Sequence, residues 1–234
     1  MIDKLIRLLK LFIPYSFKTF YKKNYREFNA SKLLDKKMLK YINYNNGYFI
    51  EIGAHDGIHH SNTFYYEKYK NWSGILIEPS EYFKNLLKNR SKKNKFFNCG
   101  CGEFGIDENE ILIESGDRSF VKKYVENNLQ NFFLRKGKQA NHKFKEKKIK
   151  LRNLNSILTE SEAPIFIDFF SLDVEGSELK VLKGNDFNKF NFKFILVECV
   201  NEKKFNEVYN FLTGKNYELV EKLTPWDILF RYSS

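Results

Sequence analysis

The stretch Tyr48-Phe49-Ile50-Glu51-Ile52-Gly53-Ala54-His55-Asp56-Gly57 decides the fold of this chain. Its first residues form a short apolar and aromatic run, which predicts a buried strand. An acid, Glu51, closes that strand, and two glycines follow four positions apart, at 53 and 57. This spacing is typical of a nucleotide-binding turn, in which one glycine permits the sharp bend and the other lets the backbone approach a ligand.

The acid at the end of this strand indicates the charge of the ligand. A carboxylate beside the turn would repel a pyrophosphate, whereas it would attract a cation. The amino and sulfonium groups of S-adenosylmethionine (SAM) are cations of this kind. The turn therefore predicts a SAM site.

A second strand ends in a second acid. The apolar run Gly74-Ile75-Leu76-Ile77 is followed by Glu78 and Pro79, and Glu78 lies 27 residues after Glu51. Dinucleotide-type folds place at this spacing the carboxylate that accepts hydrogen bonds from ribose hydroxyls. The alternative is an ordinary α/β domain with acids at its strand ends.

Strand and helix patterns alternate along the chain, which predicts a parallel sheet. Four predicted strands end in acids, namely Glu51, Glu78, Asp173 and Glu198. Because ligands bind at the carboxyl ends of such strands, we expect a cation-binding mouth there. The predicted strands are 48–51, 74–78, 95–98, 165–173 and 194–198, with a closing hairpin of 217–220 and 227–232. The predicted helices are 31–44, 62–69, 80–90, 154–160, 177–182 and 202–212.

Length and composition favour one α/β domain. The chain has 234 residues, 42% of them hydrophobic, which excludes a disordered protein. Cys99, Cys101 and Cys199 cannot form a closed set of disulfides, so the cytoplasm is the expected location. No second Cys/His pair accompanies Cys99-x-Cys101 at zinc-finger spacing, and we expect buried thiols rather than half a zinc site.

The net charge of +11 is unevenly distributed. Residues 122–150 carry ten Lys/Arg against Glu126 and Glu146. Such a segment attracts phosphates, nucleic acid or anionic lipid, although a lysine-rich composition alone also gives solvated lysines. We expect an irregular hairpin at 103–118, then a lysine-rich insertion at 119–150 with little apolar pattern near the acceptor site.

Residues 1–30 form a basic arm ahead of the domain at 31–234. Leu5, Leu8, Leu9 and Phe12 recur at helical spacing, with Lys4, Arg7 and Lys10 between them. The run is too short and too basic for a membrane span or a secretory signal. It could lie on a membrane surface, which would give a peripheral contact at the inner face, or pack on its own domain or a partner.

Several motifs resemble those of the FkbM family of SAM-dependent methyltransferases. They are Phe49–Gly57, Ser61-Asn62-Thr63, Trp72–Pro79, Ser171-Leu-Asp-Val-Glu-Gly-Ser-Glu178 and Asp227–Phe230. The resemblance implies an α/β, Rossmann-like class I methyltransferase, with a seven-stranded mostly parallel sheet, its last strand antiparallel, and helices on both faces. It also implies O-methylation of a sugar hydroxyl in a bacterial polysaccharide, glycolipid or natural product. The lysine-rich insertion departs from the family, so the acceptor is not carried over.

By this resemblance the SAM site has three parts. Glu51, Gly53 and Gly57 would surround the methionine part, and Ala54 and Asn62 are further candidate cofactor-binding residues. Glu78, with Pro79, would bind the ribose, and Asn98 and Cys99 would border the adenine. Asp173 would face the methionine amino group or the reaction centre.

A sugar hydroxyl is a weak acid, so its methylation needs a base or a metal ion. His55, His59 and His60 cluster beside the turn and are candidate bases. In the rival mechanism Asp173 and Glu198, together with Glu175, hold Mg²⁺ or Mn²⁺. Glu175 could instead cap its own helix or bind substrate hydroxyls.

The acceptor itself has competing interpretations. Basic side chains of the insertion (Lys122, Lys123, Arg135 and Lys136) could bind the phosphate of a nucleotide-linked sugar. The basic segments also suit an RNA methyltransferase, but no Asn-Pro-Pro-Tyr motif or RNA-binding module occurs, which disfavours nucleic acid. A third interpretation is a methyltransferase fold that has lost its chemistry and acts as a scaffold.

Overall fold

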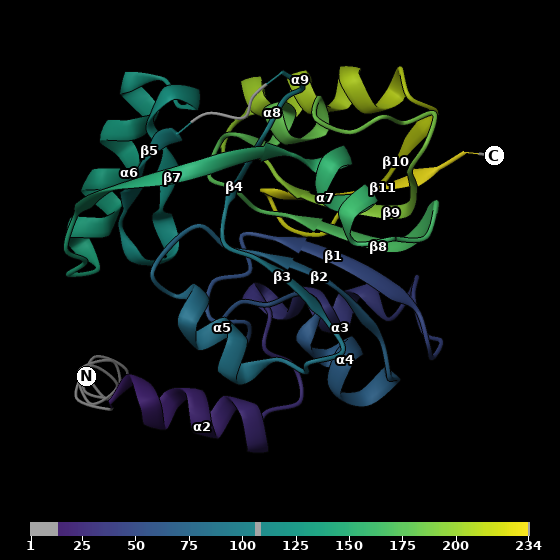
Figure 1. Cartoon of the computed structure of the whole chain (residues 1–234), viewed down its shortest axis with the longest axis horizontal. Coiled ribbons are helices and arrows are strands. Elements are labelled where there is room, and N and C mark those ends of the chain that lie inside the picture. Colours follow the sequence, from purple (N-terminus) through teal and green to yellow (C-terminus); the bar gives the residue numbers. More distant parts are fainter. Residues whose placement is uncertain (1–13, 106–108, 234) are drawn as a thin grey trace.

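The computed structural model describes residues 14–105 and 109–233, whose centre is a seven-stranded sheet (Figure 1). Its strand order is β10-β11-β9-β8-β1-β2-β3. The strands are β1 (Tyr48–Ile52), β2 (Ser73–Ile77), β3 (Lys95–Phe97), β8 (Phe166–Leu172), β9 (Asn191–Glu198), β10 (Tyr217–Lys222) and β11 (Asp227–Tyr232). β11 pairs antiparallel with both neighbours, whereas β3, β2, β1, β8 and β9 pair in parallel. The predicted mostly parallel sheet with an antiparallel last strand is confirmed.

Helices cover both faces of this sheet, as predicted (Figure 1). Side chains alternate along β1: Phe49 packs on one face, whereas Ile50 and Ile52 pack on the other. The Phe49 face carries α3 (Leu34–Met38), α4 (Phe64–Lys70) and α5 (Phe83–Asn89); the other carries α7 (Leu154–Glu160), α8 (Glu178–Leu182) and α9 (Glu202–Thr213). Each face therefore has its own apolar core, and the strand ends remain open to a ligand.

The helix predicted at 31–44 is wrong in its extent. Lys32 and Leu33 have φ angles of 49° and 58°, so the backbone is left-handed before α3 begins. The Asp35 carboxylate holds this bend, because it accepts hydrogen bonds from the backbone N–H groups of Asn29 (2.6 Å) and Ala30 (3.0 Å). The apolar spacing of the segment comes from a short helix and a following turn that pack on one surface.

A second sheet replaces the irregular hairpin predicted at 103–118 and the poorly patterned insertion predicted at 119–150. It has the order β4-β7-β5-β6, and α6 (Asn127–Gln139) packs beside it. Its strands are β4 (Gly100–Gly102), β5 (Asn109–Glu114), β6 (Phe120–Val121) and β7 (Lys145–Asn153). β5 pairs with distant β7, and a small core forms from Ile113, Phe120, Val125 and Phe133. Local sequence reasoning missed this pairing because its two strands are separated by α6.

Part of the N-terminal arm is the helix α2 (Tyr15–Tyr25), which has no buried residue. Asn29 and Ala30 are buried, and Ala30 forms a β-bridge with His60, so the end of the arm is joined to the domain. The pattern of Leu5, Leu8, Leu9 and Phe12 lies outside the described residues. None of the described helices combines the length and the apolarity needed to cross a membrane.

Phe133 tests whether the second sheet folds together with the rest of the domain. Its side chain is fully buried, so we expect Phe133→Ala to lower the free energy of unfolding by about 3–5 kcal/mol in a urea titration. The half-buried neighbour Phe132 is the matched control, and Phe132→Ala should cost clearly less. Equal losses in the two variants would contradict the core described here.

Candidate active site

A cavity of about 260 Å³ lies at the carboxyl ends of the central strands. Acids from four strand ends line it, namely Glu51, Glu78, Asp173 and Glu198. The second sheet also lines it, through residues that include Leu112, Phe120 and Val121. The cavity is therefore bounded by the two sheets together.

Most of the predicted site residues line this one cavity. They are Glu51, Gly53, His55, His59, His60, Asn62, Glu78, Pro79, Cys99, Asp173, Glu175 and Glu198. Three predicted SAM-binding residues, Ala54, Gly57 and Asn98, are not among the lining residues. Asn98 instead donates a hydrogen bond from Nδ2 to the backbone oxygen of Glu78 (2.7 Å), so it supports a neighbour of the cavity.

The two glycines of the turn have different surroundings. Gly53 has a φ of 87°, and a Cβ there would lie 1.9 Å from the carbonyl oxygen of Asp173. Gly57 has a φ of 80°, and a Cβ there would lie 2.6 Å from Cγ of Arg90. Gly53 thus lets the turn pass the end of β8 beside the cavity, whereas Gly57 makes room for a buried arginine.

Glu51 uses its carboxylate to hold the loop that follows the turn. Its oxygens accept hydrogen bonds from the backbone N–H of Asn62 (2.7 Å) and from the hydroxyls of Ser61 (2.8 Å) and Thr63 (2.7 Å). Arg90 is buried and donates to the same carboxylate (3.3 Å). The charge of Glu51 is largely compensated within the protein, so this residue shapes the cavity wall.

Glu78 presents its carboxylate to the cavity from the end of β2. One oxygen accepts a hydrogen bond from the backbone N–H of His55 (2.7 Å) and the other from that of Ser80 (2.8 Å). These bonds fix the orientation of the carboxylate, and each oxygen keeps a further lone pair. Ribose hydroxyls could use those lone pairs.

Cys99 and Cys101 are buried free thiols, as predicted.

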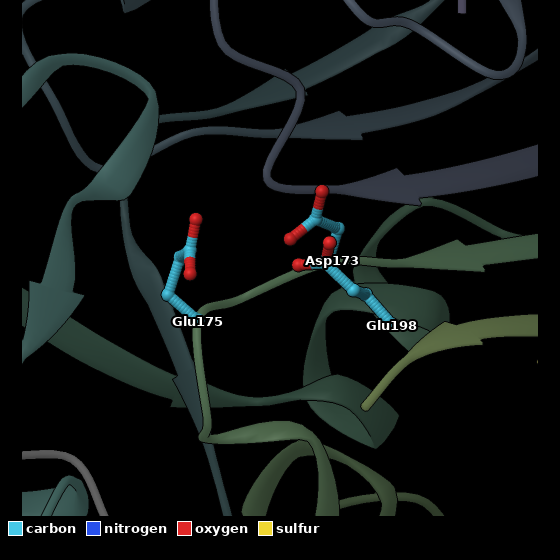
Figure 2. Close-up of side chains that lie close together, drawn as sticks. All are labelled: Asp173, Glu175 and Glu198. Carbon is cyan, nitrogen blue, oxygen red and sulfur yellow. The ribbon is translucent and has the colours of Figure 1, made fainter. Parts of the chain in front are cut away.

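Three carboxylates lie close together at the ends of β8 and β9. Asp173, Glu175 and Glu198 each offer an oxygen, and these atoms lie within 4.8 Å of one another. Figure 2 shows all three side chains directed toward the same space beside the strand ends. Glu175 has a φ of 52°, a conformation that is uncommon for a residue other than glycine.

The surroundings of these carboxylates raise their pKa values. Burial, and then the charges of Glu198 and Glu175, raise the pKa of Asp173 well above its usual value, although its side chain is reachable from the cavity. Burial and the charge of Glu198 also raise the pKa of Glu175, against the opposing charge of Arg118. Burial raises the pKa of Glu198 too, although its contact with Asp173 opposes that rise. A bound cation would remove this repulsion.

The three predicted histidines have different environments. The Nδ1 of His59 lies 2.6 Å from Oδ2 of the buried Asp56, and its Nε2 is buried with no hydrogen-bond partner in the described part of the chain. Burial opposes ionisation of Asp56, but the His55 ring 3.6 Å away and the hydrogen bonds to His59 and Tyr15 outweigh it and lower the pKa of Asp56. His60 is more exposed to the solvent, and burial of its ring by protein still lowers its pKa. His59 alone has the geometry of a carboxylate-oriented base.

Sequence reasoning missed Asp56 and Arg118. Arg118 lines the cavity from the short turn before β6. Its charge opposes the rise in the pKa values of Glu175 and Glu198. The predicted phosphate-binding side chains Lys122, Lys123, Arg135 and Lys136 are not among the lining residues. Instead, Lys122 and Lys123 pair with glutamates outside the cavity, and Arg135 and Lys136 lie over the Phe132 ring.

The sequence matches the family described as "Methyltransferase FkbM domain" over residues 51–219, which include the turn and the carboxylate cluster. The chain belongs to the FkbM methyltransferase family. The family is one of methyltransferases, and SAM is the methyl donor general to their fold. A comparison with curated proteins gave no match.

Two solved structures are similar to this FkbM methyltransferase. One is the methyltransferase FkbM from Methylobacillus flagellatus, with 17% identity, a TM-score of 0.48, and coverage of 80% of this chain and 44% of that chain. The other is the precorrin-6y C5,15-methyltransferase from Geobacter metallireducens, with 11% identity, a TM-score of 0.45, and coverage of 90% and 97%. The chain thus spans less than half the length of the first protein.

Glu178 provides a pH test of this buried acidic region. Burial raises its pKa to about 7, despite hydrogen bonds from the backbone N–H groups of Gly176 and Val174. The pKa in the folded protein exceeds the unfolded value of about 4.3, so the folded state favours the protonated carboxyl. The resulting contribution to the unfolding free energy is complete below the unfolded pKa and is lost as the pH rises through about 7.

We therefore expect Glu178→Gln to flatten the decline in unfolding free energy of the ligand-free protein between pH 4.5 and 8, by up to about 3 kcal/mol. Urea titrations across this range measure it. Glu162→Gln, which changes an exposed carboxyl, is the control and should leave the decline as it is. An unchanged decline in Glu178→Gln would show that this carboxyl is not the group that titrates.

Proposed function

We propose that this chain is a SAM-dependent O-methyltransferase acting on a sugar hydroxyl of a bacterial polysaccharide, glycolipid or nucleotide-linked sugar. The observation that carries the proposal is the carboxylate cluster of Asp173, Glu175 and Glu198, which faces one cavity beside the glycine turn of a methyltransferase family member. Such a cluster favours a cationic donor and a cation-assisted reaction.

The donor would occupy the part of the cavity next to the central sheet. Glu78 has oriented lone pairs for the ribose hydroxyls, and Cys99 and Pro79 lie beside it in the lining. Gly53 leaves the methionine part close to the backbone of the turn. Asp173 is the acid that can face the positive amino or sulfonium group, since its side chain is reachable from the cavity.

Two groups could activate the acceptor hydroxyl, and the carboxylate cluster is the one that we favour. Asp173, Glu175 and Glu198 are hard oxygen donors, which suit Mg²⁺ or Mn²⁺. A divalent cation there would lower the pKa of a bound hydroxyl. The residues themselves would orient the ion, and their raised pKa values mean that its binding releases protons.

The alternative base is His59. With Nδ1–H donated to Asp56, the lone pair at Nε2 is available to take the hydroxyl proton. A buried acceptor without a partner costs about 1–3 kcal/mol, which a hydroxyl donor in the cavity would offset. Asp56 would then hold the imidazole in one tautomer and stabilise its protonated form.

The second sheet would recognise the acceptor. Its strands contribute Leu112, Phe120 and Val121 to the lining, and the segment just before β6 contributes Arg118 and Ser119. A guanidinium suits a phosphate or a carboxylate on the acceptor. Arg118 therefore replaces the lysines of the insertion as our candidate for binding a nucleotide-linked sugar.

Isothermal titration with SAM tests the donor site. We expect binding by the wild-type protein and about tenfold or weaker binding by Glu78→Ala, because the ribose loses a charged acceptor. Glu81→Ala, three residues away and exposed, is the matched control and should bind normally. No binding by the wild-type protein at millimolar SAM would reject an active methyltransferase.

Metal removal distinguishes the two modes of activation. Transfer of labelled methyl groups from SAM to a panel of nucleotide-linked sugars should fall after exhaustive EDTA treatment and return with Mg²⁺ or Mn²⁺. Glu175→Gln should lower the turnover number by about 10²-fold or more while SAM still binds. Full turnover after EDTA, together with loss of turnover in His59→Gln, would favour the histidine base.

A further inference from the structure

The helix α2 presents its aromatic face outward. Phe17, Phe20, Tyr21 and Tyr25 are 57%, 55%, 53% and 71% exposed. Phe20 and Tyr21 lie three and four residues after Phe17, so these three side chains share one side of the helix. A surface helix normally directs such a side toward its own core.

The opposite side of α2 contacts the domain through polar groups. Tyr15 donates a hydrogen bond to Asp56 (2.5 Å), and Lys23 donates to the backbone oxygen of Lys88 in α5 (3.5 Å). Figure 1 shows α2 along the outside of the domain, below α5. The aromatic side is therefore directed away from the molecule and is not needed for docking of the helix.

The charge of the helix as a whole indicates what covers its aromatic side. Lys18, Lys22, Lys23 and Arg26 are the charged residues between positions 14 and 26, so the segment carries +4 without any acid. A second copy of the helix would bring two such segments together and repel. The occupant must therefore be both apolar and negatively charged.

We propose that α2 is an interfacial helix that binds the protein to anionic lipid bilayers. Phenylalanine and tyrosine rings suit the boundary between headgroups and acyl chains, and basic side chains beside them attract anionic headgroups. Binding of this kind needs both the apolar rings and the charges, because neither term alone holds a protein at a membrane surface. The inference is independent of the methyl acceptor.

Co-sedimentation of the full chain with vesicles tests the proposal. The vesicles are phosphatidylcholine alone or phosphatidylcholine with phosphatidylglycerol. We expect binding to the anionic vesicles, weakened by high salt, and about tenfold or weaker partitioning of the Phe17→Ser/Phe20→Ser double variant. Lys18→Gln, which leaves the Lys23 contact with the domain intact, should also weaken it. Ile165→Ser is the matched control, since Ile165 is 72% exposed elsewhere, and should bind as the wild type does.

Folding is checked separately by thermal unfolding and SAM titration, which the exposed substitutions should leave unchanged. Three outcomes would overturn the proposal: no binding to either kind of vesicle, equal binding to neutral and anionic vesicles, or binding that the phenylalanine variant retains. Sedimentation velocity without vesicles tests the alternative, in which a second copy of this chain covers the aromatic face. A dimer that depends on Phe17 and Phe20, without vesicle binding, would assign the aromatic face to a second copy.

Discussion

Repulsion among three closely spaced carboxylates at the strand ends is the constraint that the rest of this structure must accommodate. Asp173, Glu175 and Glu198 place oxygens within 4.8 Å of one another, and each carboxyl has a raised pKa. Unfolding would relieve that repulsion, so the fold must be stabilised elsewhere. Two apolar cores, one on each face of the central sheet, provide this stabilisation. The strands can then end in acids without losing their alignment.

Rigid loops keep the acids where the sheet brings them. The carboxylate of Glu51 accepts four hydrogen bonds or ion-pair contacts from the loop and from Arg90. Breaking a buried pair of this kind costs several kcal/mol, about 3–5 in typical cases. The wall of the cavity is thus fixed by internal charge pairing, while the oxygens of Asp173, Glu175 and Glu198 face the cavity, where a ligand can reach them. Glu51 therefore has a structural role, whereas the acid at the end of the neighbouring strand, Asp173, faces the cavity.

The central sheet followed from the sequence because its signals are local. Strands such as Tyr48–Ile52 are short apolar runs closed by a turn residue, and their order needs only the right-handed crossover rule. Acids at strand ends also predicted which side chains would meet, since parallel strands end at one edge. That edge collects Glu78, Asp173 and Glu198 in one cavity.

The second sheet could not be read in this way. β5 and β7 pair across an intervening helix, and the lysines of β7 obscure the alternation of Ile149 and Leu151. For the same reason Arg118, placed by that sheet, was missed. Gly57 looked like a residue for ligand approach, yet its space is taken by Arg90, which lies 33 positions later. Partners distant in sequence decided these roles, and a local pattern does not contain them.

Tyr15 connects the helix α2 to the wall of the cavity. Its hydroxyl binds Asp56, and its ring stacks on His59 with centroids 4.9 Å apart, so the first turn of α2 forms part of the support behind the cavity wall. Any ligand that shifts this contact changes the energy of both neighbours. If binding of a partner by α2 changes the affinity of the cavity for its ligand, thermodynamic reciprocity requires that ligand binding changes the affinity of α2 for its partner by the same factor.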